Sequence, residues 1–342
     1  MSQHIATEST VVLALETSCD ETAAAVVMGG SDVLSSIVSS QIDIHARFGG
    51  VVPEIASRAH LESLIPVVNS AIDEAGILPS RIDVVAATAG PGLIGALLVG
   101  VSAAKSLALV WDKPFVGVNH LEAHLYAGLL DDPTLQFPLI VLLVSGGHTM
   151  IIEMRGHGDY TVLGRTIDDA AGEAYDKVAR FLNLGYPGGP VIDKIASDGN
   201  PHAVEFPRAM QHDGLDVSFS GLKTAVMNHV RRNPDMSNVD IAASFQAAVV
   251  DILCIKTIRA AQQVGAKGIV LGGGVSANSA LRAEMTRRGN DAGFPVALPS
   301  RAMCTDNAAM IAAAAWHRFA ADGPTSLACG AYPNLKLNAV PR

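Results

Sequence analysis

The chain has 342 residues, of which 49% are hydrophobic and 17% charged, so it can bury a large core and is long enough for two domains. Its formal net charge is −9 and it has no long basic run, which argues against tight binding to nucleic acid by charge alone. None of the four cysteines forms a C-x-x-C pair, and residues 1–10 lack the basic and apolar parts of a signal peptide. We therefore expect a cytoplasmic protein with reduced thiols.

The first half of the chain alternates short apolar runs with longer stretches of helical spacing. The longest apolar stretch, residues 93–111, is interrupted by Lys105 and by Gly and Ser, which favours a buried helix over a membrane span, so no membrane contact is expected. The predicted strands are 11–15, 23–28, 33–40, 82–87 and 115–118, and the predicted helices are 53–76, 93–110 and 119–130.

The second half repeats this order of elements. Its predicted strands are 139–144, 150–154, 160–166, 268–271 and 295–298, and its predicted helices are 170–182, 241–264, 276–288 and 306–320. Both halves read β-β-β-α-β-α-β-α, which predicts an α/β protein of two duplicated lobes. We expect an N-terminal lobe at 1–130, a C-terminal lobe at 131–325 with a helical insertion at about 185–240, and a tail at 326–342.

Two histidines lie four residues apart in the predicted helix 119–130. His120 and His124 share one helix face, so both rings can reach one metal ion, although the spacing does not say which metal. The alternative is that the two rings merely face solvent or each other. Zinc proteases place a Glu directly after the first His, whereas Glu122 is turned roughly 200° from His120. The pattern therefore argues for a metal site and against such a protease.

Two glycine-rich turns follow predicted strands. Val144-Ser145-Gly146-Gly147 lies between two strands, and Gly272-Gly273-Gly274-Val275-Ser276-Ala277-Asn278 leads into a helix. Backbone N–H groups in such turns can approach a phosphate. Each turn alone is more often an ordinary tight turn, but two of them in a duplicated α/β chain favour a nucleotide cleft between lobes. The spacing matches neither a Walker A loop nor G-x-G-x-x-G.

Three carboxylates are candidate functional groups. Asp20 and Glu21 lie in the first hairpin turn, where they could handle metal, water or a proton, although their local sequence favours a solvated turn. Asp306 lies in the first turn of the predicted helix 306–320, where an acidic residue commonly complements the helix dipole. Its functional alternative is to complete a His-His-Asp metal set.

Several longer motifs occur together in one order, namely Glu16–Thr22, Asn119–His124, Val144–Thr149, Gly172–Lys177, Tyr186–Pro190, Phe219–Lys223, Gly272–Asn278 and Cys304–Asn307. With these motifs, the chain from about 11 to 320 resembles the tRNA N6-adenosine threonylcarbamoyltransferase family. The resemblance implies an actin/Hsp70/hexokinase-like fold, in which two ribonuclease-H-like lobes enclose a cleft.

The resemblance also implies a ligand set. One divalent metal ion per subunit, with iron expected and zinc as the alternative, is held at the positions of His120, His124 and Asp306. The positions that bind substrate in the family fall on Leu143, Val144, Ser145, Gly146, Gly147, Asp176, Gly189, Asp193 and Asn278. Archaeal and eukaryotic members usually carry Tyr at the position of Leu143; leucine offers no ligand atom, so more metal positions stay open for water or substrate.

The activity implied by the resemblance is the transfer of a threonylcarbamoyl group from threonylcarbamoyl-AMP to tRNA, with release of AMP. The acceptor is N6 of the adenosine 3′ to the anticodon in tRNAs that read codons beginning with A. Asp20 or Glu21 would accept the amine proton. Bacterial members work with a smaller paralogue of the same fold and a P-loop ATPase. The alternatives are a metalloprotease of glycoproteins and a non-catalytic nucleotide-binding module.

Overall fold

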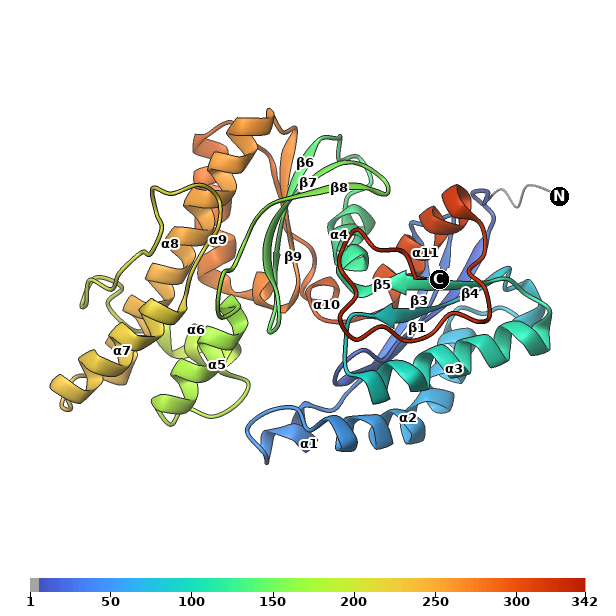
Figure 1. Ribbon diagram of the computed structural model, residues 1–342, viewed down its shortest axis with the longest axis horizontal. Helices are drawn as coiled ribbons and strands as arrows, with labels where there is room; N and C mark the ends of the chain where they lie inside the picture. Colours follow the sequence, from blue (N-terminus) through green and yellow to red (C-terminus); the bar gives the residue numbers. More distant parts are fainter. Residues whose placement is uncertain (1–5, 342) are drawn as a thin grey trace. The chain divides into compact units, whose positions relative to one another are not determined.

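The computed structural model describes residues 6–341 and divides them into two compact units (Figure 1). The first unit contains the described residues of Met1–Pro133 and Thr305–Arg342, and the second contains Thr134–Cys304. Each unit contains one five-stranded mixed sheet.

The sheet of the first unit has the strand order β3-β2-β1-β4-β5. Its strands are β1 (Val11–Glu16), β2 (Glu21–Met28), β3 (Asp32–Ser40), β4 (Val84–Gly90) and β5 (Phe115–Asn119). Every residue of β1, β4 and β5 is buried, as expected for strands covered on both faces, although β5 lies at the edge of the sheet. The helices are α1 (Ile42–Ala46), α2 (Pro53–Glu74), α3 (Ile94–Trp111), α4 (His120–Asp131) and α11 (Ala308–Asp322), with a 3₁₀ turn, η1, at Pro79–Arg81.

The two faces of this sheet carry different helices. Leu13 and Leu15 share a core cluster with residues of α2 and α3. Since successive strand residues point to opposite faces, Val12 and Ala14 face the other side, where α11 contacts the sheet.

The sheet of the second unit has the strand order β10-β9-β6-β7-β8. Read from the opposite edge, this is the order of the first sheet, so the duplicated α/β fold expected from the element order is confirmed. The strands are β6 (Leu139–Val144), β7 (Thr149–Gly156), β8 (Asp159–Arg165), β9 (Gly268–Gly272) and β10 (Val296–Ala297). The helices are α5 (Ala171–Phe181), α6 (Gly188–Ala196), α7 (Ser220–Arg232), α8 (Asn238–Val264), α9 (Ser279–Asp291) and α10 (Arg301–Cys304), with a 3₁₀ turn, η2, at Gly274–Ala277.

Two predicted helices begin later than expected. The chain at 276–278 belongs to η2 and its cap, so the helix expected from 276 begins at Ser279. Asn307 caps α11 through its side chain, so Asp306 precedes the helix instead of lying in its first turn. Helix-dipole complementarity within the first turn therefore does not explain Asp306.

The last helix belongs to a different unit from the one expected. The sequence-based boundaries place residues 305–325 in the C-terminal lobe, but α11 packs on β1, β2 and β5 and belongs to the first unit. Its run of buried alanines fits closely against the flat face of that sheet.

Helices α3 and α8 are long and apolar enough by composition to cross a membrane. In the structure α8 is largely buried, and α3 packs on β4 through a small-residue face that includes Gly100 and Ala104. Helix α8 is a core helix, and α3 buries one face against the sheet, as the interrupted apolar pattern of α3 predicts.

Candidate metal centre and glycine turns

Helix α4 starts directly at the carboxyl end of strand β5. Asn119 ends the strand and caps the helix, because its side-chain oxygen accepts hydrogen bonds from the N–H groups of Leu121 and Glu122. His120 is therefore the first helical residue and His124 follows one turn later, which places both rings on one face. The ring centroids are 4.7 Å apart, at an interplanar angle of 82°.

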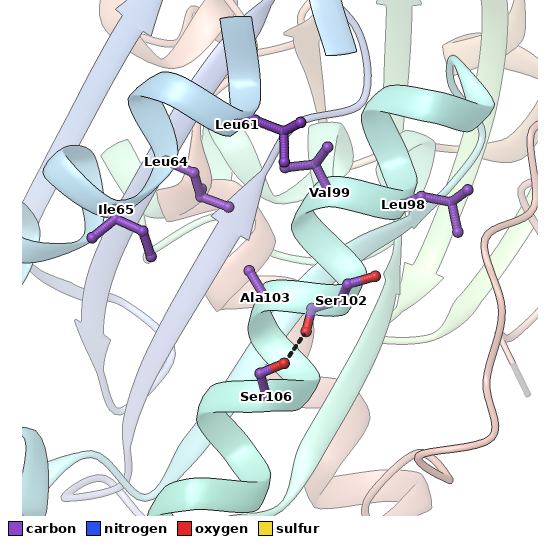
Figure 2. Close-up of a pocket in the computed structure, with 8 residues that line it drawn as sticks. All are labelled: Leu61, Leu64, Ile65, Leu98, Val99, Ser102, Ala103 and Ser106. Carbon is purple, nitrogen blue, oxygen red and sulfur yellow. Dashed lines mark hydrogen bonds between the residues drawn. The ribbon is translucent and has the colours of Figure 1, made fainter. Parts of the chain in front are cut away.

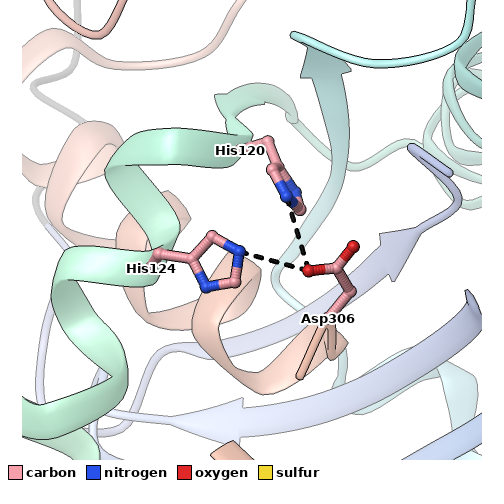
Figure 3. Close-up of side chains that lie close together, drawn as sticks. All are labelled: His120, His124 and Asp306. Carbon is pink, nitrogen blue, oxygen red and sulfur yellow. Dashed lines mark ion pairs between the residues drawn. The ribbon is translucent and has the colours of Figure 1, made fainter. Parts of the chain in front are cut away.

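Asp306 lies against both histidines, although it is 182 residues further along the chain than His124. Its Oδ1 is 3.1 Å from Nε2 of His124 and 3.5 Å from Nε2 of His120 (Figure 3). Two ligands that each sit about 2.0–2.2 Å from one metal ion are separated by about 3–4 Å. The three side chains could thus hold a metal ion between them without a change of backbone.

Glu16, the last residue of β1, holds His120 from the side away from Asp306. Its Oε2 is 3.0 Å from Nδ1 of His120 and accepts a 2.6 Å hydrogen bond from the Thr88 hydroxyl, while Oε1 accepts from the N–H of Ser18. A carboxylate at Nδ1 places the ring proton there and leaves Nε2 free to bind a metal. This is the arrangement that orients many metal-binding histidines.

The electrostatics of this cluster favour a cation. Burial lowers the pKa of His120, but the carboxylates of Asp306 and Glu16 outweigh that effect and raise the pKa to about 9. Burial raises the pKa of Glu16, but the adjacent His120 more than compensates, so the pKa of Glu16 is lowered. The carboxylates of Glu16 and Asp306 therefore attract a proton to His120, and a divalent cation would compete with that proton.

The ring of His124 provides a test of whether a metal fits. His124 is 1% exposed, and among residues 6–341 neither of its ring nitrogens has a hydrogen-bond partner. A buried polar atom left unpaired costs about 1–3 kcal/mol, so such atoms call for an explanation. Nε2 lies 3.1 Å from Oδ1 of Asp306 but forms no hydrogen bond with it, and a metal between the two atoms would satisfy both. Imidazole with carboxylate is a donor set that suits iron or zinc.

Glu122 does not face this centre. It is buried, and its carboxylate forms a 2.9 Å ion pair with Arg318 of α11. The side chain therefore links α4 to α11. Its direction away from the metal centre agrees with its angular offset from the two histidines.

Asp20 and Glu21 lie at the turn between β1 and β2, within the electrostatic influence of Asp306. Burial, followed by the charges of Asp306 and Asp20, raises the pKa of Glu21 to about 10. The backbone carbonyl of Asp20 accepts a 2.9 Å hydrogen bond from Gln41, and Ser40 donates to Glu21 at 3.3 Å. The turn is thus partly buried and structured, unlike the solvated turn that its local sequence favours.

In the first glycine turn of the second unit, a hydrogen bond to α5 fixes Ser145, and the two glycines that follow have no neighbouring atoms where a side chain would lie. Ser145 accepts a 3.2 Å hydrogen bond from Gly172 at the start of α5, and a Cβ at Gly172 would lie 2.6 Å from that carbonyl oxygen. A Cβ at Gly146 or Gly147 would meet nothing within 4 Å. Leu143 is wholly buried in β6, so its side chain is not open to a ligand in this structure.

Two other predicted substrate positions of this unit, Asp176 and Asp193, hydrogen-bond to the starts of neighbouring helices. Asp176 accepts a 2.7 Å hydrogen bond from Gly188 at the start of α6, and a Cβ at Gly189 would meet only open space. Asp193 accepts from the backbone and hydroxyl of Ser279 at 2.9 and 2.8 Å.

Asn278 is a structural cap as well as a predicted substrate position. Its Oδ1 accepts from Leu281 at the start of α9, and its Nδ2 donates to Gln246 at 2.7 Å. These bonds fix the second glycine turn relative to α8 and α9.

The sequence was compared with models of known protein families and with curated proteins. Residues 32–313 match the model of tRNA N6-adenosine threonylcarbamoyltransferase. The protein of that name from Symbiobacterium thermophilum is 53% identical over 97% of this chain and 96% of its own length. The one from Moorella thermoacetica is 53% identical over 99% of this chain and 100% of its own length. The chain belongs to this family.

Solved structures of more distant proteins share the fold of this threonylcarbamoyltransferase family member. Full-length HypF, in a phosphate- and nucleotide-bound form, matches 94% of this chain and 48% of its own with a TM-score of 0.64 and 14% identity. Component A of the Acidaminococcus fermentans (R)-2-hydroxyglutaryl-CoA dehydratase matches 90% of this chain and 98% of its own, with a TM-score of 0.55 and 13% identity. These matches agree with the actin/Hsp70/hexokinase-like fold expected from the motifs.

Proposed function

We propose that the chain transfers a threonylcarbamoyl group from threonylcarbamoyl-AMP to N6 of the adenosine 3′ to the anticodon in tRNAs that read codons beginning with A, releasing AMP. The observation that carries this proposal is the His120–His124–Asp306 group in a chain that is 53% identical, over almost its full length, to threonylcarbamoyltransferases. The reaction takes place in the cytoplasm, in keeping with four cysteines that are all free.

His120, His124 and Asp306 hold one divalent ion, with iron as the proposed metal and zinc as the alternative. When bound, the ion supplies a Lewis acid for a carbonyl or phosphate oxygen, an effect worth several kcal/mol at a transition state. Glu16 keeps the ring of His120 in the required tautomer.

The glycine turns of the second unit hold the adenylate. The open space above Gly146, Gly147 and Gly189 supports this role, because backbone amides without neighbouring side chains can approach a phosphate or ribose closely. The proposed adenylate site also includes Leu143, Val144 and Ser145, together with Asp176, Asp193 and Asn278.

Glu21 or Asp20 accepts the proton of the attacking amine. In the cation-free protein the raised pKa keeps Glu21 protonated at neutral pH. With a cation held by Asp306, the repulsion from that carboxylate would be offset and Glu21 would ionise more readily, and the ionised form is the one that a general base requires.

A glycoprotein-directed metalloprotease is disfavoured by the ion pair of Glu122 with Arg318, since this Glu cannot serve as the general base beside the metal. A non-catalytic nucleotide-binding module would not need the buried His-His-Asp group.

Partners complete the reaction, namely tRNA, a smaller paralogue of the same fold and a P-loop ATPase. Helices α2 and α3 enclose an apolar groove of about 380 Å³ on the first unit, which supports helix docking by the paralogue (Figure 2). Leu61 and Ile65 of α2 and Leu98 of α3 are among the residues that line this groove, and their exposed fractions are 66%, 56% and 48%. Exposed apolar side chains that cluster in this way mark interaction sites.

The decisive experiment supplies purified threonylcarbamoyl-AMP and measures AMP release with and without tRNA, together with modified adenosine in the tRNA. We expect AMP and modified tRNA to appear in equal amounts. AMP release without any transfer to tRNA, or no release under any condition, would contradict the proposal.

A further inference from the structure

The end of the chain is folded onto the sheet of the first unit. Chain ends are usually poorly ordered unless they are tied down. Residues 325–341, named here the C-terminal strap, run beside β5 and α4 (Figure 1). Thr325 donates a backbone hydrogen bond to Phe115 at 2.8 Å, and Tyr332 donates one to Ala89 at 2.7 Å. The strap is therefore bonded to both β4 and β5.

One buried side chain joins the strap to the metal-binding helix. Asn119 is 0% exposed, and its Nδ2 donates to the carbonyls of Lys336, Leu337 and Ala339 at 2.7, 3.3 and 3.2 Å. Its Oδ1 accepts the 3.0 Å hydrogen bond from Leu121 that caps α4. The same carboxamide thus fixes the start of α4 and holds the strap in place.

The strap also contacts β4 beside Thr88, the residue that hydrogen-bonds to Glu16. Ala89, its partner in β4, directly follows Thr88, whose hydroxyl donates to Glu16 at 2.6 Å. A Cβ at Gly90 would collide with the strap backbone, so the strap lies tightly against this end of β4. The strap therefore bonds to Asn119, which directly precedes His120, and to Ala89, which directly follows the hydroxyl donor to Glu16.

We propose that the C-terminal strap supports the metal centre and that Asn119 is the positioning residue through which it acts. The proposal rests on the metal centre proposed above. His120 is the first residue of α4, so its ring moves with the start of the helix. Metal ligation requires side chains held to within about 0.5 Å, and a loosened first turn does not meet that requirement.

Three variants separate the two roles of Asn119, as a donor to the strap and as the cap of α4. Asn119→Ser keeps a capping oxygen of similar strength but removes the donor to the strap, whereas Asn119→Ala removes both. A chain that ends at Leu335 keeps Asn119 and removes its three carbonyl partners. The matched control is Thr325→Val, which removes a strap hydroxyl that accepts from Gly117, away from the helix cap.

The measurement is Co²⁺ affinity of the metal-free protein, from chelator competition and from the visible spectrum of bound Co²⁺. We expect Asn119→Ser and the truncation each to weaken binding about tenfold and to alter the spectrum, because partners that orient metal ligands are typically worth about 10–100-fold in affinity. Combining the two should weaken binding no further, since both break the same link. Thr325→Val should leave the affinity unchanged.

Two results would overturn the proposal in distinguishable ways. If Asn119→Ser lowers the melting temperature but leaves Co²⁺ affinity and spectrum unchanged, the strap is only structural while the metal centre stands. If the wild type binds no Co²⁺, or His124→Ala binds it equally well, the metal centre fails and the strap proposal fails with it. Circular dichroism at the titration temperature shows that each variant is folded, and Asn119→Ser replaces the truncation if the shortened chain does not fold.

Discussion

His120 and His124 differ in how firmly the protein holds them. Nδ1 of His120 lies against Glu16, whereas neither ring nitrogen of His124 has a hydrogen-bond partner among the described residues. His120 is thus oriented by Glu16, whereas the polar contact of His124 is the 3.1 Å approach of its Nε2 to Oδ1 of Asp306. Both rings contribute ligand atoms to the same group with Asp306.

His120→Ala and His124→Ala should each lose the bound metal and transfer activity while keeping the fold, because the large apolar core does not depend on these two rings. Elemental analysis gives the metal content, and circular dichroism gives the folded state. His202→Ala, at an exposed position of the second unit, serves as the control. Unchanged metal stoichiometry in both variants would contradict the assignment.

The sequence could reveal some of these residues and not others. The i, i+4 spacing predicts the His pair, and only the family resemblance adds Asp306. Glu16 was not predicted as part of the site, because its partners Thr88 and His120 lie 72 and 104 residues away and no local spacing links them. The only available signal is a buried acidic residue at the end of a hydrophobic strand.

At the scale of elements, the second glycine turn contains two glycines with opposite roles. Gly273 has φ of 81°, and a Cβ there would lie 2.5 Å from the carbonyl oxygen of Val144, so any side chain strains the turn. Gly274 is exposed, and a Cβ there would meet nothing within 4 Å. Substituting Gly273 would therefore confuse a folding defect with a binding defect.

Gly274→Val should leave the melting temperature within about 2 °C of the wild type, since substitutions at open positions usually change stability by less than about 0.5 kcal/mol. It should weaken AMP binding at least tenfold, because the side chain projects into the space proposed for the adenylate. Gly273→Val should lower both stability and affinity. Calorimetric titration with AMP decides the matter, and wild-type affinity for AMP in Gly274→Val would count against the site.

The start of α7 depends on one carboxylate. Asp168 accepts hydrogen bonds from the hydroxyls of Ser218 and Ser220 at 2.5 and 2.6 Å and from the N–H of Phe219 at 2.8 Å. Burial raises the pKa of Asp168, but these hydrogen bonds outweigh it and lower the pKa to about 2. Since the folded pKa lies below the unfolded value, the stabilisation is full above about pH 4 and disappears as the pH falls toward 2.

Asp168→Asn should therefore unfold at lower denaturant concentration than the wild type at pH 7, and the difference should shrink at pH 3. Urea unfolding at the two pH values measures it. Asp159→Asn, at an exposed position paired with Arg155, is the control and should show little difference at either pH. An equal difference at pH 3 and pH 7 for Asp168→Asn would show that the ionised carboxylate is not the source of the effect.

Periodicity predicted the strands and most helices well, because each buried strand is a short apolar run. It placed the starts of α9 and α11 two or three residues too early, since the caps Asn278 and Asn307 act through side chains whose role depends on the backbone conformation. It also could not assign α11 to a sheet, because the order of elements does not determine which surface a terminal helix covers.

At the scale of the whole molecule, the charge balance does not provide an obvious anchor for tRNA. The net charge is −9, and attraction to phosphates supplies much of the affinity for nucleic acids. The groove between α2 and α3 instead exposes apolar side chains to solvent, which is typical of a protein interaction site. Both features fit a chain that acts within a hetero-complex.

Leu61→Glu combined with Leu98→Glu should abolish binding of the paralogue and multiple-turnover modification of tRNA, because two charges would have to be desolvated in an apolar interface. Metal content and AMP binding should stay at wild-type levels, since neither residue belongs to those sites. Ile167→Glu, at a position 61% exposed in the second unit, is the matched control and should bind the paralogue normally. Co-purification and turnover at near-physiological salt test this.

Full-rate turnover by the purified chain alone would contradict the need for partners, whereas retained paralogue binding by the double variant would place the interface elsewhere on the molecule.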